Sequence, residues 1–131
     1  MKSFTDLEQS KKLAEILPIE SADMCYRIVA YNPDDTHVYQ PYCFVGTLES
    51  DIPCWSLASL LSVLPTYLFE FDRGIDLNVY PNLNGRGWHC SYMPNCIENM
   101  KTDKFKLITN GDTLVDACYE MILKLNKLNL L

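Results

Sequence analysis

The central stretch of the chain, residues 53–65, has the apolar spacing of an α-helix. Leucines recur at i, i+3, i+4 and i+7, and serines form a narrow polar stripe; these positions are Leu57, Leu60, Leu61 and Leu64, and Ser56, Ser59 and Ser62. Ser56 can cap the first turn because its hydroxyl can accept a bond from a free amide, and Pro65 disfavours helical geometry in the residue before it. We therefore expect a buried helix here. Trp55 can also be buried, at the helix entry, if its indole N–H finds an acceptor.

Two further helices are predicted, one near each end of the chain. The first spans residues 6–17, with Thr5 and Glu8 as a capping box and the following proline as its stop. The second begins after Thr113, which forms a capping box with Asp116. Its apolar face consists of Leu114, Val115, Cys118, Met121, Ile122, Leu125 and Leu128. Such a face must pack against another element.

Two extended segments flank a turn between residues 24 and 45. Residues 24–31 are rich in aromatic and β-branched side chains, which favours a strand. Residues 32–35, Asn-Pro-Asp-Asp, are typical of a turn. The next extended segment, residues 37–45, contains Pro41, which cannot donate a hydrogen bond to a strand ladder. We therefore predict an edge strand or an irregular arm in this segment.

After Pro65 the apolar period changes from helical to alternating. Apolar and polar positions alternate in three runs, which we interpret as strands at residues 67–72, 76–80 and 88–92. Arg73-Gly74 and Asn84-Gly85 supply turns between successive runs, so the strands can form an antiparallel meander. A fourth strand is predicted at residues 104–108.

These elements predict an α+β fold in which three helices pack on one face of an antiparallel sheet of three to five strands. A chain of 131 residues suits a single domain covering residues 1–131. Chains of this length can bury about two-thirds of their unfolded surface around one core. Hydrophobic residues make up 48% of the chain and charged residues 21%, which argues against long disordered segments.

The net charge of −6 repels phosphate groups, which disfavours binding to nucleic acids and to anionic membranes. The lysines at positions 101, 104 and 106 form the only basic cluster, and it is typical of a solvated face. The N-terminus lacks the apolar core of an export signal, and the longest apolar run, residues 54–65, is too short to span a bilayer. We therefore expect a cytoplasmic protein with no nucleic-acid partner and no membrane association.

The cysteine pattern points neither to disulfides nor to a metal site. The chain has six cysteines: Cys25, Cys43, Cys54, Cys90, Cys96 and Cys118. A reducing compartment should keep them as thiols. They contain no C-x-x-C pair, and neither histidine stands at the offset of a zinc finger. We therefore interpret most of them as small buried hydrophobic residues, and we expect no metal and no cofactor.

The polar face of the meander is the best candidate for a ligand site. If the alternation holds, this face presents Glu70, Asp72, Asp76, Asn78, His89 and Ser91. A histidine near carboxylates can act as a general base or bind a ligand. The candidate ligand-binding residues are Glu70, Asp72, His89 and Ser91. Polar side chains also suit an outer face that simply meets solvent, which is the simpler interpretation. His89 and Cys90 point to opposite faces of a regular strand, so we predict no catalytic pair and no catalytic residue.

Three segments together resemble a known family. They are LEQSKKLAEILP with SADM at residues 21–24, PCWSLASLLSVLP at residues 53–65, and GDTLVDACYEMILKL at residues 111–125. The chain resembles, over its three predicted helices, a family of short uncharacterised proteins of gut anaerobes that are often encoded in prophages or other mobile elements. The motif W-S-L-x-x-L-L is the core of this resemblance. The resemblance implies an intracellular accessory protein of a mobile element, and it supplies no activity, cofactor or functional residue.

The expected function is therefore a non-catalytic protein-interaction module. Its partner would be a protein of the host or the mobile element, or a second copy of the chain in a homodimer. A small enzyme or ligand-binding domain that uses the polar sheet face around His89 is the alternative. Acidic mimicry of nucleic acid, directed at a DNA-binding protein, is a third interpretation. The tyrosines could line an exposed patch or be divided between core and surface.

Overall fold

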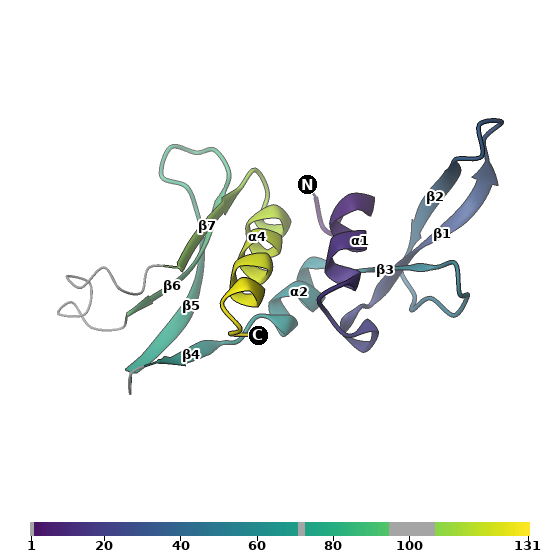
Figure 1. The fold of residues 1–131 in the computed structure, drawn as a ribbon. Coiled ribbons are helices and arrows are strands. Elements are labelled where there is room, and N and C mark those ends of the chain that lie inside the picture. Colours follow the sequence, from purple (N-terminus) through teal and green to yellow (C-terminus); the bar gives the residue numbers. More distant parts are fainter. Residues whose placement is uncertain (1, 71–72, 95–106) are drawn as a thin grey trace. The chain divides into compact units, whose positions relative to one another are not determined.

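The structure, a computed structural model, describes residues 2–70, 73–94 and 107–131, with side chains described for all of these except 67, 69–70, 73–75 and 93–94 (Figure 1). The described chain is an α+β protein with three α-helices and two antiparallel sheets. It divides into two compact units: one is Ser3–Leu60, and the other combines Met1–Lys2 with Leu61–Leu131. The expectation of one domain over residues 1–131 stays a prediction.

The Ser3–Leu60 unit contains helix α1 (Leu7–Ala14), the short 3-10 helix η1 (Ile19–Ser21) and a three-stranded sheet. Its strands are β1 (Met24–Tyr31), β2 (His37–Tyr42) and β3 (Ile52–Cys54), in the order β2-β1-β3. Apolar side chains of the sheet pack with those of the N-terminal segment, namely Met24, Tyr26, Cys54, Phe4, Leu7, Tyr39 and Ile52. The predicted turn at residues 32–35 joins β1 to β2.

Strands β1 and β2 form a long hairpin, which we call the arm. The pairing runs from Cys25 opposite Tyr42 to Tyr31 opposite His37, with a bulge between Ile28 and Ala30. Strand β3 pairs only with the first three residues of β1, so the outer part of the arm extends past β3 (Figure 1). The prediction of an edge strand at residues 37–45 is confirmed for residues 37–42, because β2 lies at the edge of its sheet.

Helix α2 (Leu57–Val63) confirms the predicted central helix. The amide of Ser59 donates to Ser56 Oγ at 3.2 Å, which is the predicted cap. Trp55 is completely buried, and its indole N–H donates to Ser21 Oγ at 2.9 Å. Burial of this ring was expected only if its indole N–H found an acceptor, and Ser21 of η1 is that acceptor.

Helix α1 begins one residue later than predicted and ends earlier, at Ala14. Its cap is Asp6 with Gln9, so the predicted box of Thr5 and Glu8 is wrong. The Thr5 hydroxyl instead accepts the Trp55 amide at 3.2 Å and lies 2.7 Å from Ser10 Oγ. Because Thr5 is fully buried, tertiary contacts take its side chain away from the helix terminus.

The second unit contains a four-stranded sheet with the order β4-β5-β6-β7. Its strands are β4 (Tyr67–Glu70), β5 (Arg73–Pro81), β6 (Trp88–Pro94) and β7 (Leu107–Gly111). All pairings are antiparallel, which confirms the predicted meander. Arg73 and Gly74 already belong to β5, so the turn predicted at these residues is wrong. Gly85 adopts φ 75° in the turn before β6, as Asn84-Gly85 predicted. The predicted fourth strand lies partly outside the described residues, and β7 continues beyond it.

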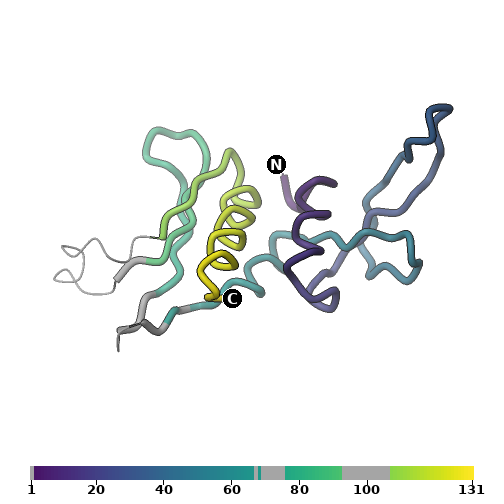
Figure 2. Tube along the Cα trace, viewed as in Figure 1, coloured from purple at the N-terminus to yellow at the C-terminus, as the bar shows by residue number. Residues whose placement is uncertain are grey.

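Helix α4 (Leu114–Lys127) packs on β6 and β7. Thr113 caps it by accepting the Asp116 amide at 3.1 Å. The buried face is Val115, Ala117, Cys118, Met121, Ile122 and Leu125, whereas Leu128 is half exposed. Figure 2 follows the chain through both units. The expectation of a single sheet is thus wrong: the described strands form two sheets, with α1 beside the smaller and α4 on the larger. None of the helices in the described part of the chain is long and apolar enough to cross a membrane.

Candidate functional site

The structure brings together part of the predicted ligand site on β5 and β6. Asn78 pairs with Ser91, and Tyr80 pairs with His89, so these four residues share the sheet face opposite the Cys90 side. Asp76 lies further along the same face of β5. The Glu70 side chain and the whole of Asp72 lie outside the described residues.

This face is not simply a solvated surface, because Ser91 is completely buried. His89 is partly buried, and its ring stacks on Tyr80 with centroids 5.0 Å apart. Ser91 Oγ and His89 Nδ1 are both buried, and neither has a hydrogen-bond partner within the described residues. Two unpaired polar atoms on one sheet face could bind a polar ligand. The described residues contain no group of three or more His, Cys, Asp and Glu side chains placed to hold a metal.

Replacing Ser91 with alanine tests whether its hydroxyl is unpaired. A buried hydroxyl without a partner destabilises the fold, so Ser91→Ala should raise the free energy of unfolding by about 1 kcal/mol. Urea denaturation of the variant and the wild type measures the difference. A loss of stability of similar size would show that Ser91 Oγ has a bonding partner in the folded protein.

The opposite face of β6 is structural. Cys90 and Cys118 are fully buried on β6 and α4, and contact between their thiols and desolvation raise the pKa of Cys90 far above its usual value. Tyr92 is also buried, and its hydroxyl donates to the Pro65 carbonyl at 2.6 Å. A thiol held neutral cannot act as a nucleophile, so Cys90 agrees with a cysteine that serves as a small hydrophobic residue. Cys25 and Cys54 are buried as well, Cys43 is exposed, and all five described cysteines are free.

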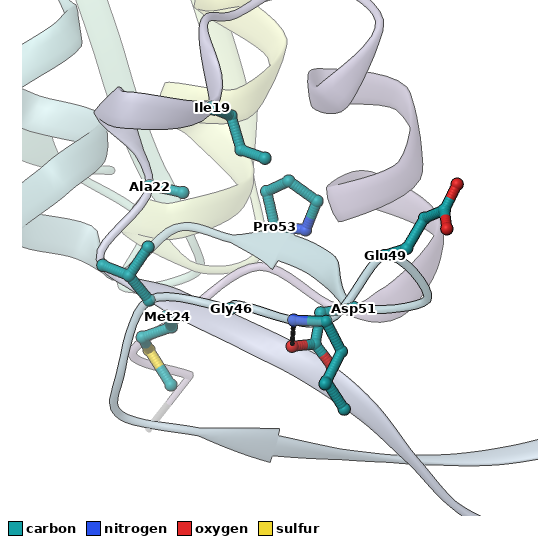
Figure 3. Close-up of a pocket in the computed structure, with 9 residues that line it drawn as sticks. Ile19, Ala22, Met24, Gly46, Glu49, Asp51 and Pro53 are labelled. Carbon is teal, nitrogen blue, oxygen red and sulfur yellow. Dashed lines mark hydrogen bonds between the residues drawn. The ribbon is translucent and has the colours of Figure 1, made fainter.

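A hollow of about 140 Å³ in the Ser3–Leu60 unit was not predicted. Its lining is Ile19, Ala22, Met24, Val45, Gly46, Leu48, Glu49, Asp51 and Pro53 (Figure 3). Ala22 and Met24 are buried, whereas three apolar side chains are more than half exposed: Ile19 at 57%, Val45 at 55% and Leu48 at 54%. We call these three residues the apolar rim. The hollow is therefore an apolar recess bordered by apolar side chains that meet solvent.

Asp51 holds the loop that carries two residues of the rim. Arg27 donates to both carboxylate oxygens of Asp51, at 2.9 and 2.7 Å, and the Leu48 amide donates to Oδ2 at 3.0 Å. These bonds, with that of Arg27 the strongest, lower the pKa of Asp51 to about 2. A Cβ on Gly46 would lie 2.7 Å from the Asp51 Cβ, so only glycine allows this close approach.

Sequence reasoning missed the hollow because its residues show no periodicity. Ile19 follows the first helix, Val45 ends the extended segment that contains Pro41, and Leu48 stands in the connection after it. Isolated apolar residues in loops are common on protein surfaces. The signal that could have drawn attention was Gly46 between Val45 and a loop leucine, since glycine often marks a close backbone approach.

The tyrosines are divided between core and surface, which is the second of the two distributions considered above. Tyr26 and Tyr92 are buried, whereas Tyr31 is 73% exposed. His37 contacts the Tyr31 ring at a centroid distance of 4.9 Å and the Tyr39 ring at 6.2 Å. An aromatic strip therefore follows one face of the arm.

Comparisons of the chain with models of protein families, with curated protein sequences and with solved structures find no match.

Proposed function

We propose that this protein is a non-catalytic interaction module that binds another protein at the hollow and its apolar rim. The observation that supports this function is the exposure of Ile19, Val45 and Leu48 around one recess. Exposed apolar side chains scattered singly need no explanation, but a group of them around a concave site is typical of protein-binding surfaces.

The size of the hollow sets the kind of contact. A cavity of about 150 Å³ accommodates a molecule as large as benzene. The hollow, at about 140 Å³, therefore suits one branched aliphatic side chain or one small ring from the partner. Entry of that side chain would remove its surface and the rim from water, which is favourable by about 25 cal/mol per Å² of apolar area. The partner would be a folded protein or a segment that presents one apolar anchor.

The rim is held in place before binding, which reduces the cost of association. Asp51 fixes the backbone of Leu48, and the guanidinium of Arg27 that bonds Asp51 also lies 5.1 Å from the centre of the Phe44 ring. A loop restrained by these contacts loses less conformational freedom when a partner binds. Preorganisation of this kind supports a binding role more than it supports catalysis.

The cellular setting is a proposal that rests on the family resemblance alone. It is a cytoplasmic accessory protein encoded by a prophage or another mobile element, and its partner is a protein of the host or of the element. Nucleic acid and membranes are not proposed as partners, because the chain has a net charge of −6.

Affinity capture with rim variants tests this function. A tagged chain and an untagged control are incubated with lysate of the native host, and the variant Val45→Ser/Leu48→Ser is compared with Leu83→Ser. Leu83 is fully exposed in the turn before β6, so its replacement removes apolar surface outside the rim. We expect the wild type and Leu83→Ser to recover a stoichiometric partner. The rim variant should bind that partner at least 10-fold more weakly, which corresponds to a loss of about 1.4 kcal/mol of binding free energy.

Two outcomes of this capture would contradict the proposal. Equal recovery by the rim variant would place the binding surface elsewhere. Loss of the partner on raising the salt concentration, with no effect of the rim variant, would instead support acidic mimicry, because exposed charge pairs are screened by salt whereas apolar contacts are not.

A polar ligand on the sheet face is a second candidate function, favoured by the unpaired Ser91 Oγ and His89 Nδ1. It would use His89 and Ser91, with Asn78 and Tyr80 beside them. A screen of small polar metabolites, followed through the NMR signals of the His89 ring, tests it. Ligands that shift these signals in the wild type and fail to do so in Ser91→Ala would support this site, and the absence of any such ligand would count against it.

A further inference from the structure

We propose that the arm joins two copies of this chain, through antiparallel pairing of β2 with β2 of the second copy. The surface involved is the outer edge of β2, which is distinct from the hollow. Within the described residues β2 pairs with β1 alone, so its other edge has no strand beside it. Unpaired N–H and C=O groups along such an edge form a template for another strand.

The arm also lacks the support that a stable sheet needs. Strand β3 covers only Met24 to Tyr26 on the far side of β1, so the pairing from Arg27 to Tyr31 is a two-stranded ribbon. An isolated two-stranded ribbon is of marginal stability in water. Pairing of two arms along β2 would give each ribbon a third and a fourth strand, and would cover part of Val38, which is 39% exposed.

The charges on the edge favour a second copy as the occupant. The chain carries a net charge of −6, so most of its surface repels another copy. Strand β2 lacks this source of repulsion, because its six residues, HVYQPY, include no Asp, Glu, Lys or Arg. Charged side chains and prolines are the usual means by which edge strands resist pairing. Strand β2 has no charged side chain and one proline, Pro41.

The sequence of β2 is also compatible with its own antiparallel pairing. Residues directly opposite each other share a sheet face, so a two-fold axis normal to the sheet must lie midway between the two copies of one residue of the strand. With the axis at Gln40, Val38 of each copy lies opposite Tyr42 of the other. With the axis at Tyr39, the two Tyr39 rings are neighbours. Neither register places two charges together, and both bury apolar or aromatic pairs.

The interface is small, so the association should be weak and concentration-dependent. Sedimentation equilibrium of the wild type, up to about 1 mM, should show the mean mass rising from 15.1 kDa towards twice that value. Gln40→Glu places like charges on or beside the axis and should weaken association about 10-fold. Leu83→Glu adds the same charge in the turn before β6 and should leave association unchanged. Circular dichroism of each variant shows whether it is folded.

Cysteine cross-linking tests the geometry independently of mass. The background variant is Cys43→Ser, because Cys43 is the exposed cysteine among those described. Only the residue at the axis meets its own copy within the reach of a disulfide, for which Cα atoms must lie about 4.4–6.8 Å apart, because the copies of any other residue are also displaced along the strand. With oxidised glutathione, Gln40→Cys or Tyr39→Cys should form a covalent dimer, whereas Ala30→Cys on β1 should remain monomeric.

The proposal is overturned if the wild type is monomeric at every concentration. It is also overturned if a dimer forms that Gln40→Glu does not weaken, or if Ala30→Cys cross-links as readily as Gln40→Cys and Tyr39→Cys do at best. If the chain is monomeric and still captures a different protein through the rim, the proposed dimer is contradicted and the proposed function of the hollow is not.

Discussion

Replacing Trp55 with alanine should lower the free energy of unfolding by about 3–5 kcal/mol, which is the usual cost of removing a large buried aromatic side chain. Trp55 is completely buried. Its removal leaves a cavity that its neighbours can fill only in part, and it leaves the Ser21 hydroxyl without the indole N–H. Because small domains have a total stability of about 5–15 kcal/mol, this loss should remove a large share of the stability of the fold.

Two milder variants separate packing from hydrogen bonding at this position. Trp55→Phe keeps a ring but removes the indole N–H, and Ser21→Ala removes only the acceptor. Ser21→Ala should cost about 1 kcal/mol, and Trp55→Phe should lie between it and Trp55→Ala. Urea denaturation followed by circular dichroism gives all three values. A loss below about 1 kcal/mol for Trp55→Ala would contradict the position of this ring in the core.

Replacing Asp51 with asparagine should lower the free energy of unfolding by about 2 kcal/mol at neutral pH, the usual value for hydrogen bonds to a charged group. The Asp51 side chain is only 3% exposed, and it accepts two bonds from Arg27 and one from the Leu48 amide. Asparagine has the same shape, but its NH₂ group faces a guanidinium that can only donate. The variant should therefore also loosen the loop that carries Val45 and Leu48.

The effect of Asp51 should depend on pH in a defined direction. The pKa of Asp51 falls from 3.8 to about 2 in the folded protein, chiefly through the bond with Arg27. The folded state thus binds this proton less readily than the unfolded state does. The resulting stability is fully present above pH 3.8 and is lost as the pH falls towards 2.

Unfolding measured from pH 7 to pH 2 checks this direction. The difference between the wild type and Asp51→Asn should be constant near neutrality and should narrow below about pH 4. Asp35→Asn, a change in the exposed turn of the arm, should alter stability by less than about 0.5 kcal/mol. A difference that grows on acidification would mean that Asp51 does not stabilise the fold as an anion.

Local patterns in the sequence predicted the parts of the fold that local physics decides. The helix after Ser56 and the helix after Thr113 both begin at the expected cap. The turn at Asn84-Gly85 forms because glycine at position 85 accepts a positive φ. The two caps join residues three positions apart, and the turn depends on the backbone of Gly85 itself.

Features that depend on distant contacts could not be predicted in this way. Thr5 and Asp6 were both able to cap the first helix, and the choice was made by Trp55, whose amide binds the Thr5 hydroxyl. The small sheet forms because β1 pairs with β2 and also with β3, where Tyr26 lies opposite Ile52, and no local pattern encodes the register of this second pairing. The single predicted sheet failed for this reason.

The predicted ligand site was found in part, and the hollow was missed. Alternation correctly placed Asn78, His89 and Ser91 on one face, because the period of a strand is local. It could not show that Ser91 is buried, since burial depends on what covers the sheet. The hollow depends on Ile19 meeting a loop more than 20 residues away, which no spacing rule describes.

The binding role of the rim is tested most directly by photo-crosslinking in the native host. Leu48 is replaced by the photoreactive residue p-benzoylphenylalanine, and Leu83 is replaced in a matched control. Both positions are exposed, so the probe should not disturb the core. If the rim binds a partner, irradiation should join position 48 to one host or element protein and leave position 83 without that adduct. No adduct at position 48, or the same adducts at both positions, would contradict binding at the rim.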